Sequence, residues 1–407
     1  MRRNILVSSA LALIAFLPLT AAAQDEPTRL LRAPDLSDDH LVFVYAGDLW
    51  LADRDGADPR RLTSHPAEET RPLFSPDGTK IAFEADYDGQ LDVYVIDVAG
   101  GQPTRLTWHP ANDRVMDWAP DGSAVAFSSD RETDHGRSEQ LYHVPVEGGF
   151  PEKQMDARFF QGRYDANAER LAYIDHGAGY NGLFGGSSGW QGYRGGTTPS
   201  IRVLDIDDQS LIDIPGDRVT DFNPMWVGDE VFFLSDRENE RFNLFRFDPE
   251  SARIGQVTFE STWDIRAANA HDGTLVYEAG GDLRTMDIAS GESITLAISL
   301  NPDLPQLRGG WTSVAGTVQG IDISPTGMRA IVTARGDVFT VPAEKAYGER
   351  RDDMQSVVPK DRLPDDLEPE VGQTLQAKNE EGQVIPVRVV GVGDRSEEHT
   401  SELQSLL

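Results

Sequence analysis

A chain of 407 residues is long enough for two or three ordinary domains, and 39% hydrophobic with 26% charged residues is typical of a folded globular protein. Its 68 acidic residues outnumber 37 basic ones, and the resulting formal charge of −31 predicts no nucleic-acid partner, because such a surface repels phosphate backbones. The absence of cysteine excludes disulfides, thiolate nucleophiles and cysteine-ligated zinc.

The N-terminus has the pattern of a secretory signal peptide. Arg2 and Arg3 precede an apolar run over residues 5–19, and small residues end at Ala23 before Gln24. We therefore expect cleavage between Ala23 and Gln24, and a periplasmic or secreted location. The apolar run is shorter than the ~20 residues that a membrane-spanning helix needs, so no membrane span is predicted.

A repeat follows the signal peptide. The stretch "FSPDGTKIAF" at residues 74–83 returns as "WAPDGSAVAF" at residues 118–127, and "RLT" occurs at 61–63 and again at 105–107, in both cases 44 residues later. The Pro-Asp-Gly units predict tight turns, and the alternating residues after them predict strands. A period of 40 to 45 residues with several short strands per unit is typical of propeller blades.

Weaker copies extend the repeat into six units between residues 24 and 300. They cover 41–63, 163–175, 225–248 and 268–288, in addition to the two clear copies. The predicted fold class is therefore all-β, a six-bladed propeller of four-stranded blades. Residues 301–342 contain a linker with two prolines and one more "SPTG" unit, which we interpret as the first blade of a second, incomplete propeller.

The repeat region resembles TolB-like propellers and, more specifically, the N-terminal part of tricorn-type serine proteases. The resemblance rests on the order "GDLWLADRDGADPRRLT", "FSPDGTKIAFEADYDG", "LYHVPVEGG", "WQGYRGGTTPSIRVLDI" and "FNPMWVGDEVFFLSDRE", and covers residues 28–342. It implies a six-bladed propeller that comes before a seven-bladed one, a PDZ-like module and a catalytic core, with the propellers acting as conduits and filters for peptides. Nothing after residue 342 matches that core, so no catalytic residue is assigned.

The sequence changes character after Pro342. Residues 343–394, with "AYGE", "VVPKDRLP" and "VRVVGVGD", resemble the flap-insert part of FKBP-type peptidyl-prolyl isomerases. The resemblance implies that Tyr347 is a binding residue of an isomerase pocket, although the rest of that pocket is missing from the sequence. Residues 395–407 resemble a translated sequencing adapter. We interpret the chain as a chimera of these segments; a real fusion is the alternative.

Other motifs have simpler structural explanations. Ser187 lies in "GGSSG", but this nucleophile-elbow pattern lacks the flanking strand and helix that the motif requires. "DRDGADP" at 53–59 and "DYDGQLD" at 86–92 resemble calcium loops, yet Asp-Gly turns explain both. "SDRE" at 129–132 and 235–238 is expected to end the inner strands of two blades and to form charged turn networks. His65 and His109 recur with the repeat, which favours a role in loops over zinc binding. We predict no metal and no cofactor.

Four functions remain open. The first is the non-catalytic propeller of an exported tricorn-type serine protease, which recruits or gates peptides or unfolded polypeptides, with a homo-oligomer possible in the full-length parent. The second is a TolB-like scaffold for protein interactions. The third is isomerase or chaperone activity of the C-terminal fragment, and the fourth is a prolyl-oligopeptidase-type hydrolase without its α/β domain. The "YRGG" insert at 193–196 favours the first over the second and fourth.

Overall fold

The computed structural model describes residues 27–133, 138–175, 195, 198–238, 240–304, 315–342, 374–378 and 384–388. The chain divides into two compact units, Met1–Leu304 and Pro305–Leu407, which are described separately. In the parts that can be described, no helix is long and apolar enough to cross a membrane.

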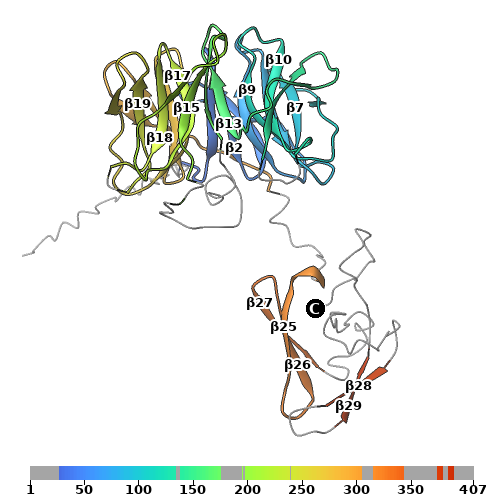
Figure 1. Ribbon diagram of the computed structural model, residues 1–407. Helices are drawn as coiled ribbons and strands as arrows, with labels where there is room; N and C mark the ends of the chain where they lie inside the picture. Colours follow the sequence, from blue (N-terminus) through green and yellow to red (C-terminus); the bar gives the residue numbers. More distant parts are fainter. Residues whose placement is uncertain are drawn as a thin grey trace, which may run out of the picture. The chain divides into compact units, whose positions relative to one another are not determined.

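The first unit contains six four-stranded antiparallel sheets, and each sheet is formed by one continuous stretch of chain with its strands in sequence order (Figure 1). In the first three sheets the strands are β1 (Arg32–Leu36), β2 (His40–Tyr45), β3 (Asp48–Asp53), β4 (Arg60–Arg61), β5 (Glu69–Phe74), β6 (Lys80–Ala85), β7 (Asp92–Asp97), β8 (Thr104–Arg105), β9 (Asp113–Trp118), β10 (Ala124–Ser129), β11 (Gln140–Pro145) and β12 (Glu152–Lys153). In the next three they are β13 (Gln161–Tyr164), β14 (Arg170–Ile174), β15 (Ile201–Asp205), β16 (Leu211–Asp213), β17 (Asp221–Val227), β18 (Glu230–Ser235), β19 (Asn243–Asp248), β20 (Arg253–Gln256), β21 (Ile265–His271), β22 (Thr274–Ala279), β23 (Asp282–Asp287) and β24 (Ser293–Thr295).

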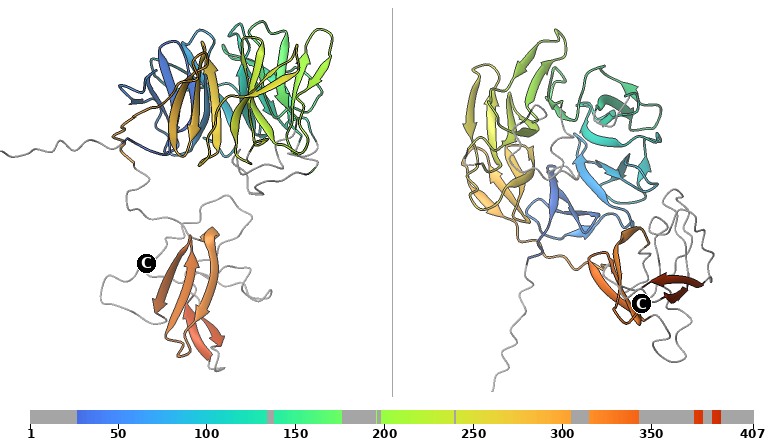
Figure 2. Two further views of the ribbon diagram at one scale, coloured as in Figure 1. Left: turned by 90° about the vertical axis from the view of Figure 1, so that its left-hand side faces the viewer. Right: turned by 60° about the horizontal axis from the view of Figure 1, so that its bottom comes forward.

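The sheets pack side by side around a common axis (Figure 2). The first strand of each sheet contacts the first strand of the next one, and β1 contacts β21 and β22, so the ring closes. The closure includes a hydrogen bond of 2.7 Å from the Thr28 amide to the Ile298 carbonyl. The predicted all-β propeller class is confirmed by this arrangement.

The core lies between neighbouring sheets. The second strand of every sheet has an aromatic residue at the same position, and all six are at most 5% exposed: Phe43, Phe83, Phe127, Tyr173, Phe233 and Tyr277. One apolar cluster, for example, joins Val42 and Leu51 of the first sheet to Ile81 and Ile96 of the second. Because a single sheet cannot bury both of its faces, each sheet depends on its neighbours for stability. The stretches "VYVI" at 93–96 and "VFFL" at 231–234 belong to this core.

The turns predicted from Pro-Asp-Gly are present. Gly78 and Gly122 have φ of +68° and +72°, a region that favours glycine because it lacks a Cβ. In the first of these turns the Asp77 carboxylate accepts a hydrogen bond of 3.1 Å from the Thr79 amide. Short turns of this kind explain why the repeat is visible in the sequence.

The second unit contains a three-stranded sheet of β25 (Val318–Ile323), β26 (Arg329–Ala334) and β27 (Asp337–Pro342), preceded by a short 3-10 helix η3 (Ala315–Thr317). A separate pair consists of β28 (Thr374–Lys378) and β29 (Val384–Arg388). The β25–β26 turn repeats the blade turn, because the Ser324 amide donates to the Arg329 carbonyl at 2.8 Å as the Ser75 amide does to Lys80.

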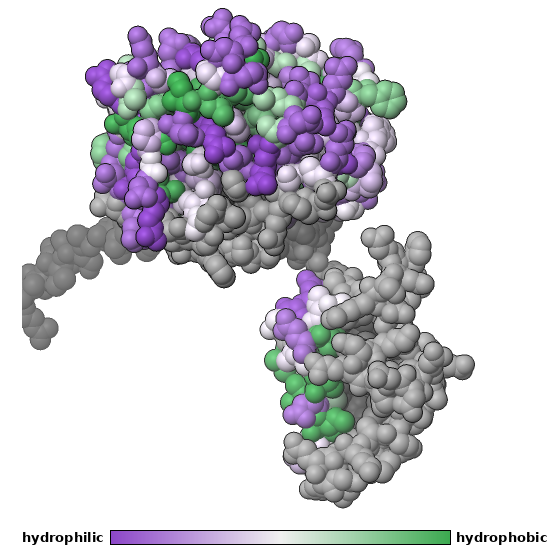
Figure 3. Space-filling model, in the orientation of Figure 1, coloured by the Kyte–Doolittle hydropathy of each residue, from purple (hydrophilic) through white to green (hydrophobic). Residues whose placement is uncertain are grey.

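Apolar side chains gather on the three-stranded sheet (Figure 3). Ile331 is 45% exposed and Val338 is 68% exposed, whereas Ala82, which occupies the position of Ile331 in the second blade, is fully buried. This sheet has the turn chemistry of a blade. Among the residues that can be described, no neighbouring sheet buries its apolar side chains as the six complete sheets bury one another's.

Candidate functional site

The innermost strands carry arginines in five of the six sheets and an asparagine in the other. They contribute Arg32 from β1, Arg71 from β5, Arg114 from β9, Arg163 from β13 and Arg266 from β21, with Asn223 from β17. Arg71 and Asn223 have φ of +50° and +54°, and the strand register shifts at both positions. These are β-bulges, which redirect the side chains of the bulged strand.

Two arginines and two glutamates form what we call the axis cluster: Arg71, Arg114, Glu84 and Glu139. The distances are 3.4 Å from Arg71 Nε to Glu84 Oε1, 3.9 Å from Arg114 Nη1 to the same oxygen, and 3.6 Å from Arg114 Nε to Glu139 Oε1. All three exceed the length of an ordinary N–H···O hydrogen bond. The charges therefore attract one another without close hydrogen bonding.

Burial changes the acidity of the axis cluster. It lowers the pKa of the Arg71 guanidinium, an effect that the Glu84 carboxylate opposes. Burial likewise raises the pKa of Glu139, and the positive charge of Arg114 opposes this change. Glu84 is held in place by the Val115 amide of the next sheet, which donates to it at 3.1 Å. The cluster thus combines acidic and basic groups that are partly removed from water.

Arg163 reaches across the axis, and we call its contacts the Arg163 bridge. Its Nη2 donates to Asn269 Oδ1 at 3.1 Å, although Arg163 belongs to the fourth sheet and Asn269 to the sixth. Its Nε lies 3.9 Å from Asp117 Oδ1 of the third sheet. The Asn269 side chain in turn donates to the Pro34 carbonyl of the first sheet at 2.9 Å. The bridge therefore connects four of the six sheets.

Two aspartates, the buried Asp35 and the partly exposed Asp117, face the Arg163 bridge. Burial raises the pKa of Asp35 to about 6, opposed by the Phe74 amide and by Arg163. Burial also raises the pKa of Asp117, opposed first by Arg163 and then by the Tyr164 amide. Both aspartates accept a hydrogen bond from the amide of the next inner strand, at 2.7 Å from Phe74 and 2.8 Å from Tyr164.

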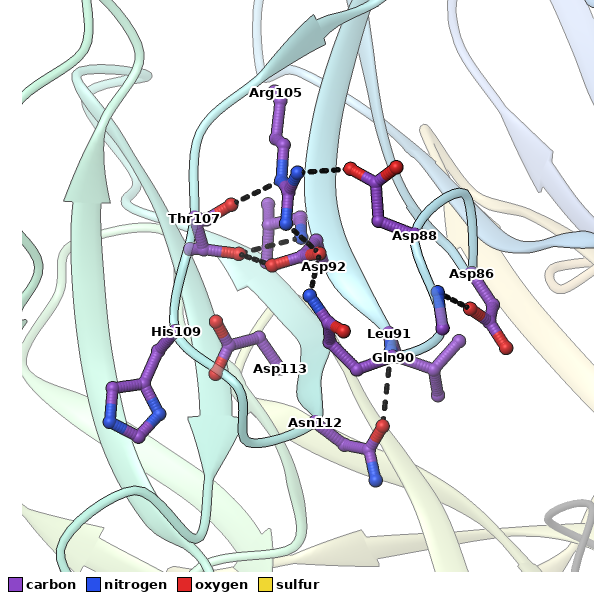
Figure 4. A network of polar contacts seen from close by, with 12 residues as sticks. Asp86, Asp88, Gln90, Leu91, Asp92, Arg105, Thr107, His109, Asn112 and Asp113 are labelled. Carbon is purple, nitrogen blue, oxygen red and sulfur yellow. Dashed lines mark hydrogen bonds and ion pairs between the residues drawn. The ribbon is translucent and has the colours of Figure 1, made fainter. Parts of the chain in front are cut away.

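The repeated "RLT" unit forms a network at the outer part of the blades (Figure 4). Arg105 Nη2 lies 2.6 Å from Asp92 Oδ2, and Thr107 Oγ1 accepts from the Val93 amide at 2.9 Å. In the first blade, Arg61 and Asp48 pair at 2.6 Å, and Thr63 accepts from Leu49 at 2.9 Å. The threonine hydroxyl replaces a backbone acceptor where the fourth strand ends, which gives this unit a structural role.

The "SDRE" motifs form charged networks, as predicted. Arg131 lies 2.6 Å from Asp113, and Arg237 lies 2.9 Å from Asp221. Ser129 and Ser235 end β10 and β18, the second strands of their sheets, which lie between two neighbouring strands as the predicted inner strands do.

The histidines and the calcium-like loops also have local explanations. The Nδ1 atoms of His65 and His109 accept from the amides of Ala67 and Ala111, both at 3.1 Å, which confirms their loop role. Asp86 accepts from the Gly89 amide at 2.7 Å, a hydrogen bond within its own turn. Within the described part of the chain, no group of three or more His, Asp or Glu is arranged to hold a metal ion.

The remaining site predictions fall on residues outside the described ranges. These are the cleavage site at Ala23 and Gln24, the motif serine Ser187 and the isomerase-like Tyr347. Sequence reasoning did not identify the axis cluster or the Arg163 bridge. The available signal was an arginine in the first strand of several repeats, as in "ETRPLF", "DRVMDW" and "QGRY".

The chain is similar to tricorn proteases in sequence and in fold. It is 30% identical over 321 residues to tricorn protease homolog 2 of Streptomyces coelicolor, covering 76% of this chain and 26% of the relative. It is 28% identical over 263 residues to tricorn protease homolog 1 of the same organism, covering 64% and 24%. The crystal structure of the tricorn protease matches 78% of this chain and 30% of that chain, with a TM-score of 0.64 and 19% identity, a likeness of fold.

The chain thus spans about a quarter of the length of the curated relatives it matches. Residues 28–292, nearly the whole ring of six sheets, match the family model described as the tricorn protease N-terminal beta propeller domain. On the strength of that match, this chain belongs to the family of tricorn protease N-terminal β-propellers.

Proposed function

We propose that the ring is the non-catalytic propeller of an exported tricorn-type serine protease, and that it recruits or gates peptides or unfolded polypeptides. The family match supports a role in proteolysis, and the short span relative to the curated relatives is consistent with chemistry carried out elsewhere in the parent protein. Export to the periplasm or beyond, and assembly of the full-length parent into a homo-oligomer, are parts of the same proposal.

The axis cluster is the observation that carries this proposal. Guanidinium groups donate to carboxylates and carbonyl oxygens, which every peptide presents, and buried carboxylates accept from peptide N–H and amino groups. Arg71 and Arg114 come from adjacent sheets, and the partner carboxylates Glu84 and Glu139 lie 3.4 to 3.9 Å from them. An axis lined in this way favours polar polypeptide over apolar ligands.

Arg114→Gln is expected to weaken peptide binding about tenfold, the effect of losing one charge-assisted hydrogen bond. The measurement is fluorescence anisotropy with labelled, unstructured peptides of about ten residues and the full chain, with thermal unfolding to check that the variant folds. The matched control is Arg253→Gln on the outer strand β20, where the arginine side chain is 83% exposed. Equal affinities of both variants, or cleavage of the peptide by the chain itself, would contradict the proposal.

We propose further that residues 343–394 derive from an FKBP-type isomerase and that residues 395–407 are adapter sequence, so that neither contributes to function. Long-read sequencing of the source DNA across codons 338–350 should show the propeller sequence continuing past Pro342 into a second propeller. A single uninterrupted read through the present junction would instead establish a real fusion, and Tyr347 would then be a candidate for isomerase assays.

A further inference from the structure

Arg163, its partners Asn269 and Asp117, and the nearby Asp35 lie at the same end of the ring. Asp35, Asp117 and Arg163 each stand one residue before the end of β1, β9 and β13, and Asn269 stands two residues before the end of β21. The first strands of all the sheets run in the same direction along the axis, because each sheet starts with its innermost strand. The bridge therefore crosses the axis near the turns that lead from the first to the second strands.

We infer that the Arg163 side chain blocks the axis of the ring at this end. Its hold there weakens when the carboxylates beside it take up protons. The inference deepens the gating role proposed above, and its biological meaning rests on that role. Arg163 Nη2 spans to Asn269, two sheets away, and its charge acts on Asp35, which belongs to the opposite sheet of the six.

The titratable and charged groups around the Arg163 side chain come from four strands and from the turn after β1. Those that act on Asp35, Asp117 or Arg163, or contact them through one further residue, are Arg71 on β5, His143 on β11, Tyr164 on β13, His271 on β21 and Asp38 after β1. Of these, His143 bonds the Tyr164 hydroxyl at 3.0 Å and His271 bonds Asp38 at 2.8 Å. Asp35 and Asp117 are thus the acidic groups whose charge faces Arg163 itself.

Mild acid should weaken the electrostatic interactions that keep the Arg163 guanidinium in place. The pKa of Asp35 is raised to about 6 and that of Asp117 is raised as well, so both lose negative charge at a higher pH than an exposed aspartate does. When they are neutral, Arg163 keeps the amide oxygen of Asn269 as its remaining partner in the bridge. A neutral amide binds a guanidinium less strongly than a carboxylate does.

The absence of cysteine allows a direct test with a single introduced thiol. Gln161 lies two residues before Arg163 on β13 and therefore on the same face of the strand, one step further along the axis. In Gln161→Cys, we expect the rate of maleimide labelling, normalised to a free cysteine peptide, to rise severalfold between about pH 7.5 and about pH 5. Adding Arg163→Ala should raise the rate at pH 7.5 about tenfold or more and abolish the response to pH.

Two further variants serve as controls. Asn269→Ala removes the far anchor without altering β13 and should also speed labelling, whereas Arg253→Ala in the Gln161→Cys background should leave the rate unchanged. Labelling that is equally fast with and without Arg163, in proteins whose thermal unfolding shows them to be folded, would overturn the inference. No peptide enters this assay, so its failure is distinct from a failure of the proposed peptide binding.

Discussion

Asp92→Ala is expected to lower the free energy of unfolding of the first unit by about 3–5 kcal/mol, one of the largest effects for a single substitution in this chain. The Asp92 side chain is fully buried and lies 2.6 Å from Arg105, and Thr107 Oγ1 donates to it at 3.2 Å. Removing it would leave the guanidinium of Arg105, which is only 13% exposed, without its buried partner. Urea unfolding followed by tryptophan fluorescence measures the change.

The matched control lies on the same strand. Asp97 is at the other end of β7 and pairs with Lys80 at a similar distance of 2.7 Å, but its side chain is 62% exposed. Solvent screens such a pair, so Asp97→Ala should cost less than about 1 kcal/mol. If the two substitutions cost the same, the proposed structural role of the "RLT" network would be wrong.

Asp35→Asn is expected to remove a pH dependence of stability worth up to about 3 kcal/mol, because the pKa of Asp35 rises from 3.8 to about 6 on folding and each pKa unit corresponds to about 1.4 kcal/mol. Between these two values the folded chain binds more protons than the unfolded chain. The contribution of Asp35 to the free energy of unfolding is therefore fully present below about pH 4 and is lost as the pH rises through about 6. As the pH rises from about 4 to about 6, the wild type should lose stability relative to the variant, as measured by urea unfolding at each pH.

Asp38→Asn provides a control of opposite sign. Asp38 is exposed, and its hydrogen bond and charge interaction with His271 lower the pKa of its carboxyl. Its contribution is present above the ordinary aspartate pKa and is lost as the pH falls, so the wild type should lose stability relative to this variant on acidification. Parallel pH profiles for the two variants would refute the assignment of a raised pKa to the buried Asp35 carboxyl.

The repeat made the blades predictable because each blade depends on short-range chemistry. The turn at Gly78 needs a positive φ, and the aromatic residue of each second strand, such as Phe83, must fill the space between two sheets. Both requirements fall at a fixed distance from the same turn, so they return with the period of the repeat.

The axis could not be predicted in the same way. Arg163 and Asn269 are 106 residues apart and lie in repeats that are not neighbours in the ring, and Arg163 and Asp35 are farther apart still in sequence. Their approach results from ring closure and from bulges such as the one at Arg71, which local spacing does not encode. An arginine in an inner strand has no distinctive pattern until the six strands are placed around one axis.

The most direct test of the ring and its polar axis is a crystal structure of the full chain at neutral pH. We predict that β1 contacts β21, and that the Arg163 guanidinium lies within about 3 Å of the Asn269 side chain, a hydrogen-bond distance across the axis. An open array in which the first and sixth sheets do not touch, or an Arg163 side chain that points away from the axis, would contradict the account.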